Sequence, residues 1–121
     1  MMTVRQAAVA GTFYPADPGE LAEKVDQYMA AAEGNGGMPK AIIAPHAGYI
    51  YSGPIAASAY THLAGGKDTV QRVILLGPAH RVSLRGLAAS SAQAFATPLG
   101  DVPVDQEALA NVLDLPQVRV W

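Results

Sequence analysis

The sequence contains no cysteine, which excludes disulfides and thiolate metal ligands from these 121 residues and fits a reducing compartment. Basic residues are few and scattered, 8 against 10 acidic ones, so the positive surface that nucleic-acid binding requires is missing. No apolar run approaches the roughly 20 residues of a membrane span, and residues 1–10 lack the apolar core of a signal peptide. We therefore expect a cytoplasmic protein with neither a nucleic acid nor a membrane as partner.

Two short apolar runs are typical of buried parallel strands. Residues 41–44 and 72–76 are rich in aliphatic and β-branched side chains, and each run stops at a proline or a glycine. Between them, residues 53–63 predict a helix, with Ser52 as N-cap and two glycines after its end. Strand, helix and strand in this order predict a right-handed βαβ unit in a mainly parallel sheet flanked by helices.

The other patterns complete a single α/β domain over residues 1–121. Asp17 as N-cap, followed by a proline and a glutamate, predicts a helix over residues 18–33. Further along the chain, the patterns predict a strand over 86–91, a hairpin turn over 97–101 leading into 102–104, and a helix over 105–113. The alternating valines at 118 and 120 indicate the opening of another strand, so we expect the fold to continue beyond residue 121.

A histidine follows each of the two apolar runs, His46 after the first and His80 after the second. The carboxyl ends of neighbouring parallel strands open onto one crevice, so we expect the two imidazoles to face each other there. Neutral imidazoles on rigid strand ends are typical ligands of zinc and of non-haem iron. The sequence therefore predicts a divalent metal site that includes His46 and His80.

Two residues beside these histidines are candidates for substrate binding. Tyr49 lies on the loop after His46, where packing is the alternative role, and Arg81 adjoins His80, where a solvated side chain is the alternative. His62 is left out of the site, because it lies near the end of the predicted helix, where the helix dipole favours a cation. No residue pattern identifies a catalytic nucleophile, since the Gly-x-Ser-x-Gly motif is absent.

Four motifs along the chain resemble those of the Memo family, whose bacterial and archaeal members are called AmmeMemoRadiSam system protein B. The motifs are AVAGTFYP at residues 8–15, PHAGYIYSG at 45–53, LGPAH at 76–80 and TPLG at 97–100. Each is weak alone, but four in this order are specific. The resemblance runs from about Val4 to the end of the chain, which looks like the N-terminal portion of a longer protein of this family.

The resemblance implies a fold akin to the class III extradiol dioxygenases, with His46 and His80 as metal ligands and a third ligand beyond residue 121. It implies iron(II) as the metal, with copper or zinc as alternatives. The implied partners are an AMMECR1-like protein, a radical SAM protein and an unidentified small-molecule substrate.

Three functions stay open at this point. The full-length protein could be a non-haem iron redox or dioxygenase-like enzyme, whose metal keeps positions open for substrate or O₂. It could be a metal-dependent hydrolase, in which the metal activates water. It could instead be a non-catalytic module that binds a peptide or a small molecule in the crevice.

Overall fold

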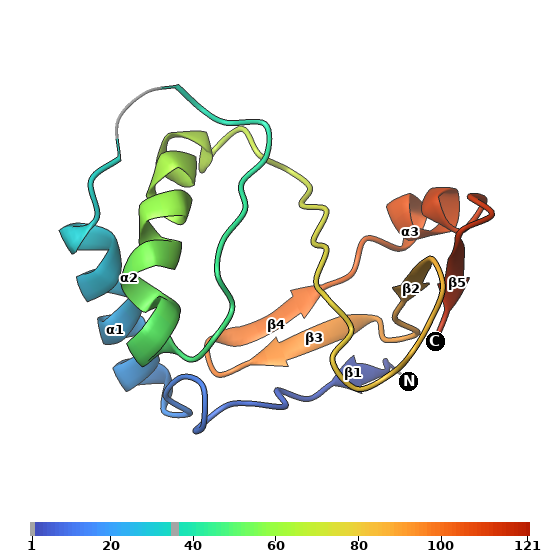
Figure 1. The fold of residues 1–121 in the computed structure, drawn as a ribbon, viewed down its shortest axis with the longest axis horizontal. Coiled ribbons are helices and arrows are strands. Elements are labelled where there is room, and N and C mark those ends of the chain that lie inside the picture. The colour runs from blue at the N-terminus through green and yellow to red at the C-terminus, as the bar shows by residue number, and fades with distance from the viewer. Residues whose placement is uncertain (1, 35–36) are drawn as a thin grey trace. The chain divides into compact units, whose positions relative to one another are not determined.

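The structure, a computed structural model, describes residues 2–34 and 37–121. The chain forms two compact units, which we call the helical unit, residues 8–71, and the sheet unit, residues up to 7 together with 72–121. The helical unit holds α1 (Pro18–Ala31), α2 (Tyr49–Tyr60) and the 3₁₀ helix η1 (Thr61–Gly66). The sheet unit holds β1 (Val4–Arg5), β2 (Leu87–Ala89), β3 (Ala94–Thr97), β4 (Gly100–Pro103), α3 (Gln106–Val112) and β5 (Val118–Val120) (Figure 1). The predicted α/β class is confirmed, whereas the single domain over 1–121 stays a prediction.

Helix α1 begins where the sequence predicts. The Asp17 carboxylate accepts a hydrogen bond from the backbone N–H of Glu20 at 2.9 Å, which satisfies one of the free amides of the first turn. The helix ends at Ala31, two residues before the predicted boundary. Within the helical unit, α1 packs beside α2 (Figure 1). Leu21 on α1 is the most deeply buried large apolar side chain of this unit.

Helix α2 begins one turn before the predicted start at residue 53, and the prediction of Ser52 as N-cap is wrong. Gly48 is the N-cap, and its carbonyl accepts hydrogen bonds from the N–H groups of Tyr51 and Ser52, both at 2.9 Å. The Ser52 hydroxyl lies inside the helix and accepts a hydrogen bond from the N–H of Ala47 at 3.0 Å. The serine therefore anchors the loop before the helix, and Pro54 lies in the second turn.

The sheet unit contains two small sheets. In the first, β1 runs parallel to β3, and β3 runs antiparallel to β4 through the predicted hairpin turn. The Thr97 hydroxyl closes this turn, because it donates to the Gly100 carbonyl at 2.7 Å and accepts from the N–H of Leu99 at 3.1 Å. In the second sheet, β2 runs parallel to β5, which confirms the strands predicted around residues 87 and 118. The predicted helix near residues 105–113 is confirmed as α3.

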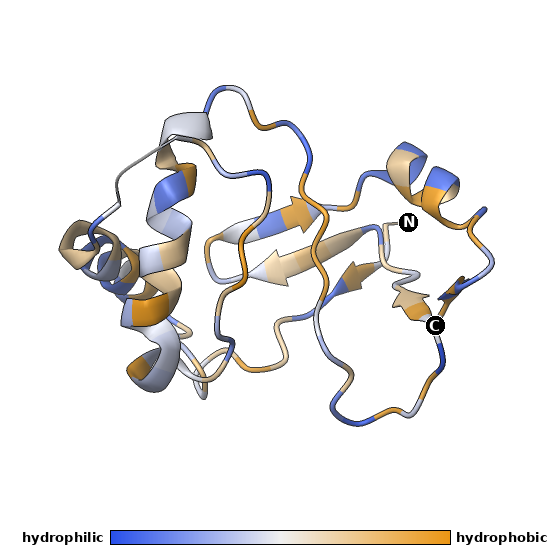
Figure 2. Ribbon diagram, turned by 45° about the horizontal axis from the view of Figure 1, so that its top comes forward, coloured by the Kyte–Doolittle hydropathy of each residue, from blue (hydrophilic) through white to orange (hydrophobic). Residues whose placement is uncertain are grey.

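The prediction of strands at residues 41–44 and 72–76 is wrong. Neither segment forms a strand, and both appear as orange, hydrophobic stretches of coil in Figure 2. Ile43 is 97% exposed, and Ile74 in the second segment is 85% exposed. A strand requires a neighbour for its backbone hydrogen bonds and a covered face for its apolar side chains. Among the described residues, no strand pairs with either segment, and only Ile42 and Ala44 are partly covered, so the predicted βαβ unit is also absent from them.

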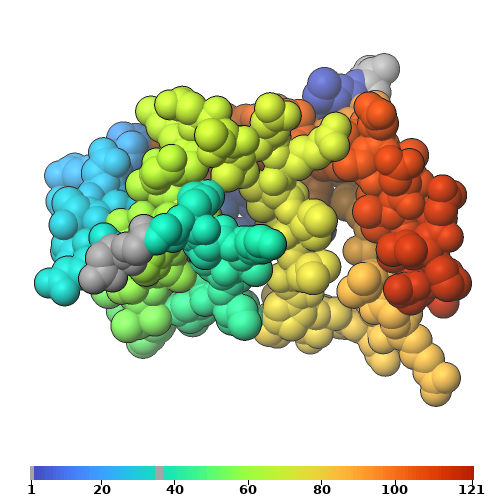
Figure 3. Space-filling view, turned by 90° about the horizontal axis from the view of Figure 1, so that it is seen from above, coloured from blue at the N-terminus to red at the C-terminus, as the bar shows by residue number. Residues whose placement is uncertain are grey.

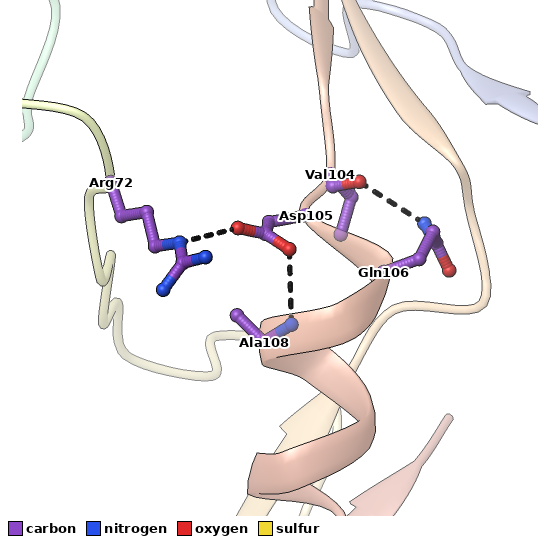
Figure 4. A network of polar contacts seen from close by, with 5 residues as sticks. All are labelled: Arg72, Val104, Asp105, Gln106 and Ala108. Atoms are coloured by element: carbon purple, nitrogen blue, oxygen red, sulfur yellow. Dashed lines mark hydrogen bonds and ion pairs between the residues drawn. The ribbon is translucent and has the colours of Figure 1, made fainter.

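Helix α3 is held by its N-cap, Asp105. One carboxylate oxygen accepts a hydrogen bond from the N–H of Ala108 at 3.0 Å, and the other pairs with Nε of Arg72 at 2.8 Å (Figure 4). The side chain of Gln106 donates to the carbonyl of Val104 at 3.3 Å in the same cluster (Figure 4). The hydrogen bond from Ala108 lowers the pKa of Asp105, partial desolvation opposes this, and the positive charge of Arg72 adds to the lowering.

This pKa predicts how the stability contribution of Asp105 depends on pH. Because the pKa is lower in the folded protein, the charged form stabilises the fold above the unfolded pKa near 4, and this contribution disappears as the pH falls through the folded pKa. We expect Asp105→Asn, which keeps a capping oxygen, to be less stable than the unchanged protein at pH 7. The difference should shrink toward zero at an acidic pH below the lowered pKa of Asp105 in the folded protein. Urea denaturation at both pH values measures it, and a difference that is independent of pH would contradict the prediction.

Candidate functional site

His46 lies on the loop that leads into α2. Hydrogen bonds fix this loop directly after the histidine, because Ala47 donates to the Ser52 hydroxyl at 3.0 Å and Tyr49 donates to the Phe13 carbonyl at 2.8 Å. The imidazole is exposed to solvent. His46 therefore belongs to a well-anchored turn of the helical unit, not to the end of a strand.

His80 lies in the sheet unit, at the end of an extended segment. Residues 71–80 are all exposed, and the segment runs along the surface in the space-filling view, where it is drawn in yellow (Figure 3). Arg81, the predicted substrate-binding residue, is the next residue and is also exposed. The structure thus places His46 and His80 on different units, with Tyr49 on the unit of the first and Arg81 on the unit of the second.

Tyr49, the other predicted substrate-binding residue, lies at the centre of a group of tyrosines. Its ring centroid is 5.6 Å from that of Tyr14, and it meets the ring of Tyr28 edge to face at 6.2 Å. Burial raises the pKa of the Tyr49 hydroxyl, and the nearby hydroxyls of Tyr14, Tyr60 and Tyr28 raise it further. The Tyr49 hydroxyl therefore stays protonated at neutral pH and can donate a hydrogen bond.

Sequence reasoning overlooks this tyrosine group because it places the start of α2 four residues too late. From its true start, the helix carries Tyr49 and Tyr60 eleven residues apart, which is about three turns, so both lie on one face. Tyr28 belongs to the apolar stripe of α1 that packs against this helix. The helical spacing of the tyrosines is the signal that identifies the group once the helix boundary is known.

The role of His46 and His80 as metal ligands stays a prediction. Two imidazoles, both solvent-exposed, are suitable nitrogen ligands for iron, copper or zinc. Among the described residues, however, no group of three or more histidine, aspartate or glutamate side chains could hold a metal ion.

Comparison with known proteins identifies the family. The profile of the family described as Memo-like protein matches residues 5–119, which is nearly the whole chain. The chain belongs to this Memo-like family. The Protein MEMO1 of Danio rerio is 39% identical over 92% of this chain. A MEMO1 family protein of Aquifex aeolicus is 40% identical over 95% of it, and one of Aeropyrum pernix is 43% identical over 88%.

The matched regions cover only part of these relatives. This Memo-like chain spans 37% of the Danio rerio protein, 42% of the Aquifex aeolicus protein and 41% of the Aeropyrum pernix protein. The match extends over both His46 and His80 and over both units of the fold. Among the described helices, none is both long enough and apolar enough to cross a membrane.

Proposed function

We propose that this Memo-like chain contributes His46 and His80 to a divalent metal site, with iron(II) as the metal and copper or zinc as alternatives. The observation that carries the proposal is the family match over both histidine motifs. Both side chains are exposed to solvent, so a metal ion can reach them. Neutral imidazole suits each of the three metals.

A complete site needs ligands beyond these two histidines. We propose that a third ligand comes from polypeptide corresponding to the part of the relatives that this chain does not span. A bound iron ion with open positions would supply redox or dioxygenase-like chemistry, as in the class III extradiol dioxygenases, whereas zinc would favour activation of water. A cytoplasmic location and action with AMMECR1-like and radical SAM proteins belong to the same proposal.

The test compares this chain with the Aquifex aeolicus relative. Both proteins are prepared without oxygen, dialysed against iron(II) or zinc, and analysed for metal content and protein concentration. We expect about one metal ion per chain in the relative and weaker, readily dialysed metal in this chain, because two imidazoles hold an ion less tightly than a full ligand set. Absence of stoichiometric metal from the relative would contradict the proposal, as would tight metal in this chain that survives loss of both histidines.

A further inference from the structure

The helical unit contains a cavity of about 630 Å³ that the metal-site proposal does not use. It lies among α1, α2 and η1, with further lining from the segments that precede the two helices, and it is partly open to solvent. This volume is in the range of pockets that hold small organic molecules. All residues that line it belong to the helical unit, so the cavity is a feature of this unit alone.

Aromatic rings form much of the lining. Phe13 and the tyrosines at 14, 28, 49 and 60 all contribute to it. A Cβ at Gly53 would lie 2.6 Å from Cε2 of Tyr28, so only glycine lets this ring rest against α2 without displacement. Tilted and edge-to-face ring pairs, as seen around Tyr49, are the arrangements that aromatic groups favour.

The rest of the lining is apolar and carries little charge. Val25 and Met29 come from α1, Ala56 comes from α2, and lysine, arginine, aspartate and glutamate are absent from the residues that line the cavity. Burying an ion in such surroundings is costly without an opposite charge. A tyrosine hydroxyl can donate and accept a hydrogen bond, which suits a ligand with one hydroxyl group.

We propose that this cavity is a binding site for a small uncharged aromatic molecule that carries a hydroxyl group. The ring of the ligand packs among the tyrosine rings and the apolar side chains, and its hydroxyl bonds to a tyrosine hydroxyl at the cavity wall. His46 lines one edge of the cavity, but the proposed contacts require no metal. The inference is therefore independent of the metal-site proposal.

Binding of 2-naphthol tests the proposal, with 2-naphthoate as the charged counterpart of the same ring system. NMR titration of protein labelled at its methionine methyls follows Met29, which lines the cavity, and Met38, which does not. We expect 2-naphthol to shift the Met29 signal saturably, with a Kd of about 0.1–1 mM, and to leave Met38 unchanged. Naphthoate should bind at least tenfold more weakly, and excess EDTA should change neither result.

Two variants of α2 locate the site. Ala56→Leu places a larger side chain in the cavity and should weaken 2-naphthol binding at least tenfold, whereas Ala59→Leu, on the same helix but outside the lining, should change it less than twofold. Equal binding of naphthol and naphthoate, or equal effects of the two variants, would overturn the proposal. The comparison of the two ligands uses the unchanged protein, so it decides the matter even if Ala56→Leu fails to fold. A naphthol titration that fails says nothing against the metal site, which is measured by metal content.

Discussion

In the longer Aquifex aeolicus relative, replacing the residue that corresponds to His46 or to His80 with alanine is expected to weaken iron(II) binding by about 100-fold or more. Each imidazole supplies one coordinate bond, and even residues that only orient a ligand change metal affinity by about 10–100-fold. Anaerobic titration against a chromogenic iron(II) chelator measures the affinity. In this chain, His46→Ala or His80→Ala should remove the weaker binding that two imidazoles support.

The two histidines lie on different units. The double variant, with His46→Ala and His80→Ala together, therefore tests whether one ion binds both imidazoles. If one ion binds both imidazoles, the second substitution should cost much less than the first, because the shared ion is already lost. His62→Ala is the matched control, since this residue lies in η1 and outside the proposed site, and it should leave iron binding unchanged. Additive effects of His46→Ala and His80→Ala, or an equal effect of His62→Ala, would contradict a shared site.

Local interactions explain which elements the sequence predicts well. Asp17 and Asp105 each bond the backbone of the residue three positions later, and this pattern can be read directly from the sequence. The turn closed by Thr97 is equally local. In each case the stabilising hydrogen bond joins residues only a few positions apart. These caps and this turn can therefore be predicted without knowing which distant segments pack nearby.

Strands are predicted less well because they depend on neighbours far along the chain. The runs at 41–44 and 72–76 have the composition of buried strands, yet Ile43 and Ile74 are exposed and no strand pairs with either run among the described residues. Conversely, β1 has only two residues, and its pairing with β3 joins Val4 to Ala94 across most of the chain. Composition indicates a tendency to be buried, but it does not identify the partner that buries the segment.

The candidate site, too, is predicted well where short motifs suffice and less well where residues distant in sequence must come together. The histidine motifs identify the family, and the family match confirms that resemblance. The roles of His46, His80, Tyr49 and Arg81 stay predictions, because a ligand set and a binding pocket depend on residues that are distant in sequence. The tyrosine group illustrates this, since Tyr14 and Tyr28 reach Tyr49 from separate segments.

Gly86 is the position where a single methyl group should destabilise the sheet unit most. Its φ angle of +80° lies in the left-handed region, and a Cβ would collide with the backbone carbonyl oxygen of Gln117. That oxygen accepts the hydrogen bond from Leu87 N–H at 2.8 Å, directly beside the pairing of β2 with β5. Gly86→Ala therefore combines backbone strain, a steric clash and a weakened hydrogen bond, and we expect it to lower the free energy of unfolding by about 3–5 kcal/mol.

Two other glycines separate these causes. Gly100 also has a positive φ, +125°, but a Cβ there meets no atom within 4 Å, so Gly100→Ala should show backbone strain alone, about 1–3 kcal/mol. Gly65 has neither a positive φ nor a close neighbour, and its replacement with alanine should change stability by no more than about 0.5 kcal/mol. Urea denaturation of the three variants measures the order. A loss for Gly86→Ala no larger than that for Gly100→Ala would show that the Gln117 carbonyl moves aside freely, and that this contact does not hold β2 against β5.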